Sequence, residues 1–295
     1  MLYCNREFFR VIILVCYLGE RFNEIKNLTK EIILGLYVSI MILDTQPIKE
    51  KIFLELKERR KKIKKELRLD IILSNDSLMS AKYVEKKILM GKSLDIDVLI
   101  HEDFRTVDIK ASNGIILQLP APANQTAYLD TIPLELDVDC LTNLDKHLTN
   151  GTYPPTIQGI LQVLESLGIG IENLKGKVVV VIGQGVLVGK PLVQTLLKLE
   201  STVISCNQYT KDLYKHTKIA DIIVSATGVA NLINIDHTSK EKYQILIDAG
   251  TTNVSSKLVG DIDQELANLK NILLCPSPKG IGPLTVLNIF KNLLK

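Results

Sequence analysis

Three glycines, Gly183, Gly185 and Gly189, directly follow an apolar, β-branched run over residues 178–182. Glycine lets the backbone of a tight turn approach a ligand closely, and the unpaired N–H groups at the start of a following helix attract a pyrophosphate. The spacing GxGxxxG is one residue longer than the commonest dinucleotide fingerprint, and a turn that needs glycines only for its shape would look the same. Residues 176–191 therefore predict a strand, a glycine turn and a helix, with a dinucleotide as the candidate ligand.

A second pair of residues with chemical potential, Tyr83 and Lys87, lies in the first half of the chain. They fall within a helix predicted over residues 80–90 and ending at Gly91, because glycine often follows the last turn of a helix. A spacing of four residues places both side chains on one face of that helix. An aromatic ring and an amine are thus predicted to face the same neighbour.

The elements that must hold these residues alternate between strands and helices. In the first half we expect a charged helix over 47–69 and strands at 70–73, 96–100 and 114–119, which make two βαβ-like units. In the second half we expect a helix over 157–167 and strands at 202–205, 221–225 and 245–249. The last two strands end in small residues, as a ligand-binding carboxyl edge of a doubly wound sheet requires. The fold class predicted is α/β with two domains, separated in the proline-rich stretch 133–155.

Composition restricts the class of protein. The chain has 295 residues, is 46% hydrophobic and carries a formal net charge of +3. No apolar stretch approaches the roughly 20 residues needed to cross a bilayer. Acidic residues interrupt the basic run 57–68, which indicates a solvated helix face. We therefore expect a globular protein that binds neither nucleic acid nor membrane. Residues 1–40 are interpreted as an N-terminal extension, with a membrane-associating amphipathic segment as the alternative.

The five cysteines are scattered and include no CxxC pair, which indicates reduced thiols and a cytoplasmic protein. The four histidines show no HxxxH spacing and no spacing to cysteine that would suit zinc. No metal site is predicted.

Several motifs in their order resemble those of the bifunctional methylenetetrahydrofolate dehydrogenase/methenyltetrahydrofolate cyclohydrolase family. The resemblance covers about residues 41–295 and rests on SAKYVEKK (80–87), NGIILQLPAP (113–122), LDVDC (136–140), YPPT (153–156), the stretch 176–191, LVGDID (258–263) and PSPKGIGPLT (276–285).

This resemblance implies a catalytic folate-binding domain over residues 41–152, completed by a C-terminal helix at 284–295, and an NAD(P)-binding Rossmann domain over 153–283. It implies oxidation of 5,10-methylenetetrahydrofolate to the 5,10-methenyl form and hydrolysis of that product to 10-formyltetrahydrofolate. It also implies a homodimer. A dehydrogenase-only homologue and a non-catalytic homologue that keeps the folate or nucleotide cleft remain alternatives.

The resemblance also assigns roles to single residues. Lys87 matches the catalytic lysine, Gln118 the glutamine that contacts it, Tyr83 the tyrosine that stacks on the folate, and Asp139 the carboxylate that holds the pterin. Pro278, Gly280 and Gly282 match backbone that lines the folate and nicotinamide pockets. The residues matched to the cofactor site are Gly183, Gln184, Gly185, Gly189, Thr227 and Gly228.

The sequence departs from the family pattern close to these residues. Leu136 and Cys140 replace a lysine and a glycine around the DVD triplet, and Lys279 replaces the first glycine of PGGVGP. In the cofactor turn Gln184 stands where an arginine often contacts the 2′-phosphate of NADP, and Gln208 where a serine is usual. Lys211 could contact a phosphate instead. NADP is expected from the family habit, with NAD as the alternative.

Overall fold

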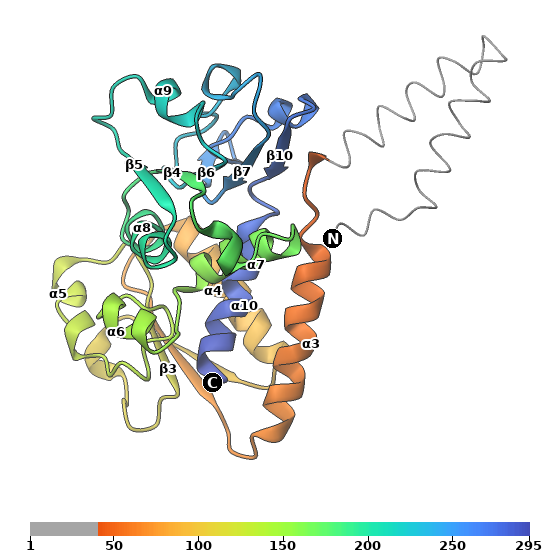
Figure 1. The fold of residues 1–295 in the computed structure, drawn as a ribbon. Coiled ribbons are helices and arrows are strands. Elements are labelled where there is room, and N and C mark those ends of the chain that lie inside the picture. Colours follow the sequence, from red (N-terminus) through yellow and green to blue (C-terminus); the bar gives the residue numbers. More distant parts are fainter. Residues whose placement is uncertain (1–40) are drawn as a thin grey trace, which may run out of the picture.

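The computed structural model describes residues 41–295. The segment 1–40, interpreted above as an extension or a membrane-associating segment, lies outside the described residues. Within the described part, two parallel sheets lie at opposite ends of the molecule, with helices between them (Figure 1). The α/β class predicted from the alternation of strands and helices is confirmed.

The first sheet has three parallel strands in the order β2-β1-β3. They are β1 (Arg68–Ile72), β2 (Asp97–His101) and β3 (Gly114–Leu117). Helix α4 (Leu78–Ser93) connects β1 to β2. Four of the five β1 residues are buried, because this strand lies between the other two. Helix α4 brings its Tyr83 and Lys87 alongside the end of β3.

The second sheet has five parallel strands in the order β10-β7-β6-β4-β5. They are β4 (Val178–Ile182), β5 (Thr202–Cys206), β6 (Ile222–Ser225), β7 (Gln244–Asp248) and β10 (Ile272–Cys275). Strand β4 has the predicted bounds, because an unbroken apolar run suits a strand covered on both faces. Strand β10 was not predicted, since a run of four apolar residues does not by itself distinguish a strand from a buried helix turn.

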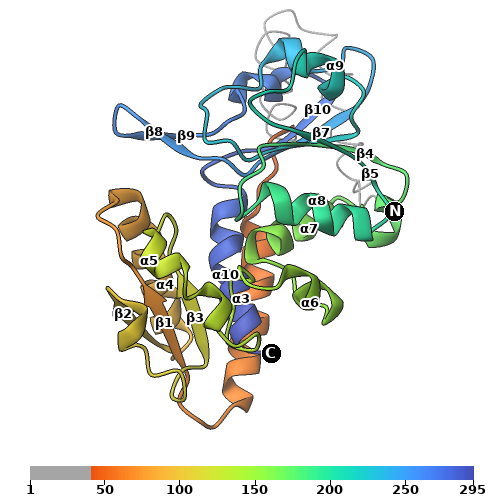
Figure 2. The ribbon, with the colours of Figure 1, turned by 90° about the vertical axis from the view of Figure 1, so that its left-hand side faces the viewer.

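Three helices pack between the two sheets (Figures 1 and 2). They are α3 (Gln46–Lys62), α7 (Pro155–Ser166) and α10 (Ile281–Leu293). Helix α8 (Gly189–Lys198) follows the glycine turn and packs on the five-stranded sheet. The N-terminal end of the described chain runs beside β10, where Leu43 N donates to Leu274 O at 2.8 Å.

Helices α7 and α10 are joined by a row of amide side chains. Gln158 Nε2 donates to Asn292 Oδ1 at 2.8 Å, and Gln162 and Asn288 exchange two hydrogen bonds of 2.9 Å. Both asparagines are buried. Gly159 allows close approach here, because a Cβ at this position would lie 3.2 Å from Leu284 Cβ. The row therefore fixes which turn of α7 faces which turn of α10.

Smaller elements complete the chain. Helices α5 (Ala123–Thr126), α6 (Leu144–Thr149) and α9 (Leu213–Thr217) are short. Strands β8 (Thr252–Val254) and β9 (Lys257–Val259) form an antiparallel hairpin. Figure 2 shows this hairpin projecting from the five-stranded sheet on the side where the three-stranded sheet lies.

Several predicted helix limits were wrong. The C-terminal helix predicted over 284–295 is α10, which already begins at Ile281 and ends at Leu293, because Gly280 and not Pro283 is its first flanking residue. Helix α3 ends at Lys62 instead of residue 69, because Ile63 takes an extended conformation and Arg68 already belongs to β1. Helix α4 continues through Gly91 to Ser93. A Cβ at Gly91 would overlap the side chain of Val98, so this position needs glycine for tight packing against β2. The glycine therefore does not mark the end of the helix.

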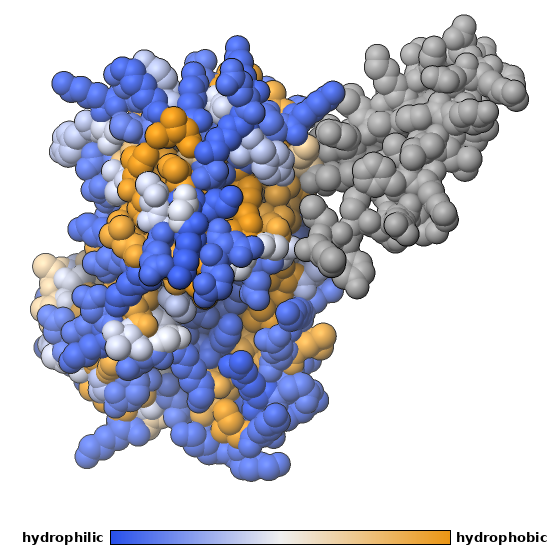
Figure 3. Space-filling view, viewed as in Figure 1, coloured by the Kyte–Doolittle hydropathy of each residue, from blue (hydrophilic) through white to orange (hydrophobic). Residues whose placement is uncertain are grey.

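One apolar area of the surface lies over β5 and α8 (Figure 3). Leu197 of α8 is 59% exposed, and Val203 and Ile204 of β5 are half-buried. Strand β5 is an edge strand of its sheet. None of the helices within residues 41–295 has both the length and the apolar character to span a membrane.

Candidate active site

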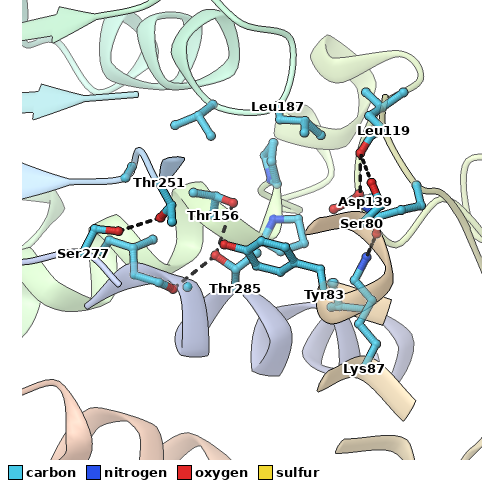
Figure 4. Close-up of a pocket in the computed structure, with 18 of the residues that line it drawn as sticks. Ser80, Tyr83, Lys87, Leu119, Asp139, Thr156, Leu187, Thr251, Ser277 and Thr285 are labelled. Atoms are coloured by element: carbon cyan, nitrogen blue, oxygen red, sulfur yellow. Dashed lines mark hydrogen bonds between the residues drawn. The ribbon is translucent and has the colours of Figure 1, made fainter. Parts of the chain in front are cut away.

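A cavity of about 300 Å³ lies between the two sheets, beside α4 and the amino-terminal ends of α7 and α10. Figure 4 shows Tyr83 and Lys87 reaching into it from α4, with Thr251 and Ser277 on the opposite side. The residues that line it include Ser77, Ser80, Tyr83, Lys87, Gln118, Asp139, Thr156, Leu187, Val188, Asp248, Thr251, Ser277, Gly282 and Thr285.

Lys87 is the buried cation of this cavity, with 5% of its surface exposed. Its Nζ donates a 2.8 Å hydrogen bond to Gln118 Oε1, the first side chain after β3. Burial lowers the pKa of Lys87 because the charged ammonium loses its hydration, and the nearby Asp139 carboxylate opposes this shift only in part. The amine therefore holds its proton less tightly than an exposed lysine does.

Asp139 is the carboxylate that faces Lys87. Burial raises the pKa of Asp139, the Lys87 charge acts against this rise, and Asp137 adds to it. Gln118 Nε2 donates to Leu119 O at 3.1 Å, which turns its carbonyl oxygen toward the lysine. The cavity thus holds a polar group of three side chains: the buried amine of Lys87, the amide of Gln118 and the carboxylate of Asp139.

The loop that carries Asp139 is held by its neighbour Asp137. Asp137 accepts hydrogen bonds from Thr142 N at 2.8 Å, from Thr142 Oγ1 at 2.8 Å and from the His147 ring at 3.0 Å. Burial alone would raise the pKa of Asp137, but the hydrogen bonds from His147 and Thr142 outweigh it and lower the pKa. These bonds explain why the first aspartate of the DVD triplet is buried while the second faces the cavity.

Cys140 adopts a left-handed conformation with φ of 55°. A glycine takes this conformation without a steric penalty, whereas a residue with a Cβ does so at a cost of about 1 kcal/mol. The departure from glycine noted in the sequence therefore places a strained residue directly after Asp139. Its side chain is buried, and burial raises the pKa of the thiol.

Tyr83 lies one helical turn before Lys87 and lines the same cavity. Its ring is half-buried, and the Nζ of Lys86 lies 5.2 Å from the ring centroid. Gly282, at the start of α10, faces the tyrosine, since a Cβ there would lie 3.9 Å from Tyr83 Oη. Thr285 on the next turn of α10 donates to Thr156 Oγ1 of α7 at 3.2 Å.

The opposite wall comes from the ends of β7 and β10. The hydroxyl oxygens of Thr251 and Ser277 are 2.6 Å apart and share a hydrogen bond. Asp248 is buried and accepts from the backbone N–H groups of Asp261 and Ile262 at 3.2 and 3.0 Å. Burial raises the pKa of Asp248 to about 7, although these N–H groups favour its charged form. This wall therefore presents two hydroxyl groups and a buried carboxyl group to the cavity.

The glycine turn forms a cradle of tightly packed backbone, in which two of the three glycines have no room for a Cβ. Gly183 has φ of 97°, and a Cβ on it would overlap Ala226 O. A Cβ on Gly189 would overlap Gly183 O, whereas Gly185 faces open space. Leu187 and Val188 of the same turn line the active-site cavity. The turn suits a bound pyrophosphate, which needs close approach of backbone N–H groups.

Polar side chains continue from this turn to the end of β5. Gln184 Nε2 donates to Ser205 Oγ at 2.9 Å, and Asn207 Nδ2 donates to Gln184 Oε1 at 3.1 Å. At the end of β6, Thr227 donates through its backbone N–H and its hydroxyl to Asp261 Oδ2, at 2.6 and 2.8 Å. The turn and the Thr227 loop therefore meet at the carboxyl edge of the sheet.

The structure brings Tyr83, Lys87, Gln118, Asp139 and Gly282 together around one cavity. The predicted cofactor glycines lie at the edge of the five-stranded sheet instead, next to this cavity. Gly280 is buried under Pro276 O and does not line it.

Two neighbours of Gly280 are also placed away from this cavity. Lys279 has an exposed side chain, and its carbonyl accepts from Thr45. Pro278 lines a second, adjoining cavity.

The hydroxyl groups of the cavity were not predicted from the sequence. Thr251 and Ser277 are 26 positions apart, and only the adjacency of β7 and β10 brings them together. Ser77 had a local signal, because its side chain accepts from Ser80 N as the cap of α4.

The family model described as "Tetrahydrofolate dehydrogenase/cyclohydrolase, NAD(P)-binding domain" matches residues 154–295. The bifunctional protein FolD of Hydrogenobaculum sp. (strain Y04AAS1) is 36% identical over 275 residues, covering 86% of this chain and 97% of that protein. The chain belongs to the tetrahydrofolate dehydrogenase/cyclohydrolase family. The resemblance inferred from the motifs is thereby confirmed.

Solved structures of the dehydrogenase/cyclohydrolase family have the same fold. The bifunctional FolD enzyme of Campylobacter jejuni superposes with a TM-score of 0.76 at 30% identity, covering 86% of this chain and 96% of that one. The enzyme of Trypanosoma brucei, complexed with NADP and an inhibitor, gives a TM-score of 0.75 at 27% identity, covering 86% and 95%. The second half of this chain is accordingly an NAD(P)-binding Rossmann domain of that family.

The glycine cradle yields a prediction about stability. Gly183→Ala is expected to cost on the order of 1–3 kcal/mol, because the new Cβ meets Ala226 O and the residue keeps a positive φ. Gly185→Ala is the matched control, since its Cβ would meet open space. Thermal melting of both variants checks this. Equal melting temperatures for the two variants would contradict the assigned turn geometry.

Proposed function

We propose that this protein oxidises 5,10-methylenetetrahydrofolate to 5,10-methenyltetrahydrofolate with NAD(P) and hydrolyses the product to 10-formyltetrahydrofolate. The observation that carries the proposal is the hydrogen bond from the buried Lys87 to Gln118 in a cavity that Asp139 and Tyr83 also line. Family membership supports both reactions, since relatives are named bifunctional.

The polar group around Lys87 suits the pterin end of a folate. The Asp139 carboxylate offers two oxygens to the ring N–H and amino group of a pterin, a pairing that strengthens when the donors lie side by side. Tyr83 offers a ring face for stacking. With these contacts the one-carbon bridge of the substrate would lie between Lys87 and the wall of Thr251 and Ser277.

The first reaction depends mainly on position. The nicotinamide of a bound NAD(P) supplies the hydride acceptor. The chain's own contribution is to hold the methylene carbon close to that ring and to exclude water from the gap. The glycine cradle, Leu187 and Val188 stand on the cofactor side of the cavity, and the Thr251–Ser277 pair fixes the adjoining loops.

The second reaction needs a proton carrier at the methenyl carbon. Water adds to that carbon, the bond from the carbon to the pterin nitrogen breaks, and that nitrogen gains a proton. Lys87, whose pKa burial lowers, takes one proton from the attacking water and delivers it to the pterin nitrogen as the carbon–nitrogen bond breaks. The second water proton leaves to solvent when the hydroxyl of the adduct becomes the formyl carbonyl. Gln118 holds the amine in place through its carbonyl oxygen.

Replacing Lys87 tests this role. Lys87→Met removes the proton carrier but fits the buried site, so methenyltetrahydrofolate hydrolysis should fall at least about 100-fold while folate binding survives. Lys92→Met, on the exposed side of the same helix, is the control and should keep full activity. Loss of the methenyl absorbance and equilibrium folate binding are the readouts.

The outcomes distinguish the alternatives. Hydrolysis retained by Lys87→Met would refute the role of this lysine. Nucleotide reduction by the wild type without hydrolysis would identify a dehydrogenase-only enzyme. Folded wild-type protein that performs neither reaction would identify a non-catalytic homologue.

We assign NADP as the preferred cofactor. Gln184, Ser205 and Asn207 form a neutral, hydrogen-bonded group beside the glycine turn, so no carboxylate among them would repel a 2′-phosphate. Lys211 follows in the same exposed loop as a source of positive charge.

Gln184→Arg tests this assignment. A guanidinium binds phosphate through two parallel hydrogen bonds, so the ratio of kcat/KM for NADP to that for NAD should rise about tenfold. Gln46→Arg, on the exposed start of α3, is the control and should leave the ratio unchanged. The assignment would be overturned if the wild type prefers NAD and Gln184→Arg leaves the ratio of kcat/KM for NADP to that for NAD unchanged.

We also propose a homodimer through β5 and α8. The β10 edge of the five-stranded sheet is covered by residues 42–43, whereas no strand within residues 41–295 covers β5. An uncovered edge strand beside exposed apolar side chains favours association.

Light scattering tests the interface. The wild type should show twice the 33.0 kDa chain mass, and Leu197→Asp should shift it toward the single-chain mass because a charge would be buried. Leu54→Asp, on the exposed face of α3, should leave the mass unchanged. A monomeric wild type would refute the interface.

The proposed domain limits follow the sheets. Residues 41–152 with 284–295 contain the three-stranded sheet and the folate contacts, and residues 153–283 contain the five-stranded sheet. Cys140, Cys206 and Cys275 are free, buried thiols, which supports a cytoplasmic protein.

A further inference from the structure

Two side-chain hydroxyls form part of the cavity wall on the side of the five-stranded sheet. Thr251 follows β7 and Ser277 follows β10, and these strands are neighbours in the sheet. Both residues line the cavity, and Figure 4 shows them on the side opposite Tyr83 and Lys87. We call Thr251 and Ser277 the hydroxyl pair.

The hydrogen bonds of the hydroxyl pair decide what it can offer to a ligand. The Thr251 hydroxyl donates to Gly250 O at 2.7 Å, which uses its only hydrogen. The hydroxyl oxygens of Thr251 and Ser277 are 2.6 Å apart, so the hydrogen between them comes from Ser277. Ser277 Oγ therefore has no hydrogen left to donate, and its lone pairs remain as acceptors.

Ser277 is a buried acceptor in a fixed position. Its exposed fraction is 5%, and its backbone carbonyl accepts from Gln264 Nε2 at 3.2 Å. Within residues 41–295, the hydrogen bond with Thr251 is the only one that its hydroxyl makes. An acceptor that is shielded from water is costly to leave unpaired, so this part of the wall favours a ligand with an N–H or O–H group.

The order of the strands indicates which ligand reaches the hydroxyl pair. A dinucleotide crosses the carboxyl edge of such a sheet, with its pyrophosphate at the glycine turn after β4. On one side of that turn lies β5, where Gln184 and Asn207 are proposed to face the adenosine half. On the other side lie β6, β7 and β10. The nicotinamide half therefore extends toward the ends of β7 and β10, where the hydroxyl pair lies.

Nicotinamide carries the matching group, because the –NH2 of its carboxamide supplies two N–H donors. We propose that Ser277 Oγ accepts a hydrogen bond from this –NH2 group. Ser277 is then a specificity-determining residue for the nicotinamide ring, and Thr251 is a positioning residue that orients the Ser277 hydroxyl. A ring held by its carboxamide presents one fixed face to the one-carbon bridge of the substrate. This inference rests on the proposed use of NAD(P).

The 3-acetylpyridine analogues of NADP and NAD test the contact. Each has a methyl group in place of the carboxamide –NH2 and keeps the carbonyl, so only the donor is lost. Calorimetry without folate gives the dissociation constants in the absence of turnover. A hydrogen bond between neutral groups is modest in strength, so the wild type should bind each natural dinucleotide about fivefold more tightly than its analogue.

Three variants distinguish this contact from a general effect on structure. Ser277→Ala removes the acceptor and should bring the ratio of the two dissociation constants close to one. Thr251→Val removes the acceptor of the Ser277 hydrogen, which frees the Ser277 hydroxyl to rotate, and should reduce the ratio. Ser93→Ala removes an exposed hydroxyl at the end of α4, outside the cavity, and should preserve it.

The two reactions give a second readout. Only the first reaction transfers a hydride to the nicotinamide. Ser277→Ala should therefore lower kcat of the dehydrogenase reaction by a similar factor of about fivefold and leave the rate of methenyltetrahydrofolate hydrolysis unchanged. A variant that had merely lost structure would lower both rates.

Equal dissociation constants of the wild type for a dinucleotide and its analogue would overturn the assignment. So would a ratio that survives both Ser277→Ala and Thr251→Val. Turnover of 5,10-methylenetetrahydrofolate by the wild type is measured separately. If the dinucleotides bind with the expected ratio but no turnover occurs, the proposed catalysis fails and the contact stands. If turnover occurs without the ratio, the contact fails and the catalysis stands.

Discussion

The packing of α7 against α10 is the constraint on which the site depends. Ile157, Ile160 and Leu164 of α7 are fully buried, and each contributes roughly 1.5–3 kcal/mol by leaving water. A buried amide hydrogen bond contributes less, about 0.5–1.5 kcal/mol, but leaving one unmade costs more. The apolar contacts therefore supply the stability, whereas the Gln158–Asn292 and Gln162–Asn288 pairs select the register. A slip of α7 along α10 by one turn would separate Thr156 from Thr285, which meet at the active-site cavity.

Within that frame, the chemistry depends on keeping a lysine out of water. An ammonium ion without hydration is costly, so Lys87 needs the carbonyl of Gln118 and the charge of Asp139. The same desolvation lowers its pKa, so the amine releases and takes up a proton more readily than an exposed lysine does. The three groups come from α4, from the end of β3 and from a loop that Asp137 and His147 hold. Cys140, with its strained backbone, directly follows Asp139. This departure from the family pattern changes the surroundings of the site, whereas Lys87 and Gln118 keep their hydrogen bond.

Local sequence patterns predicted those parts of the structure that local physics decides. Strand β4 had the predicted bounds because its β-branched run is bounded by glycines, and Tyr83 and Lys87 share a cavity because helical spacing fixes their faces. Gly91 was misread because a glycine that ends a helix and one that packs against a strand look alike in sequence. The pairing of Thr251 with Ser277 and the conformation of Cys140 depend on strand order and on distant neighbours, which no local pattern encodes.

We propose that one cleft carries out both reactions. A folate analogue with a carbonyl in place of the oxidisable methylene bridge tests this proposal. Its competitive inhibition constant is measured once for the dehydrogenase reaction and once for the cyclohydrolase reaction, with NADP saturating in both assays. A single cleft predicts the same constant for the two reactions. Two results would contradict a single cleft. One is a difference of about tenfold between the two constants, which corresponds to 1.4 kcal/mol of binding free energy, and the other is inhibition of only one reaction.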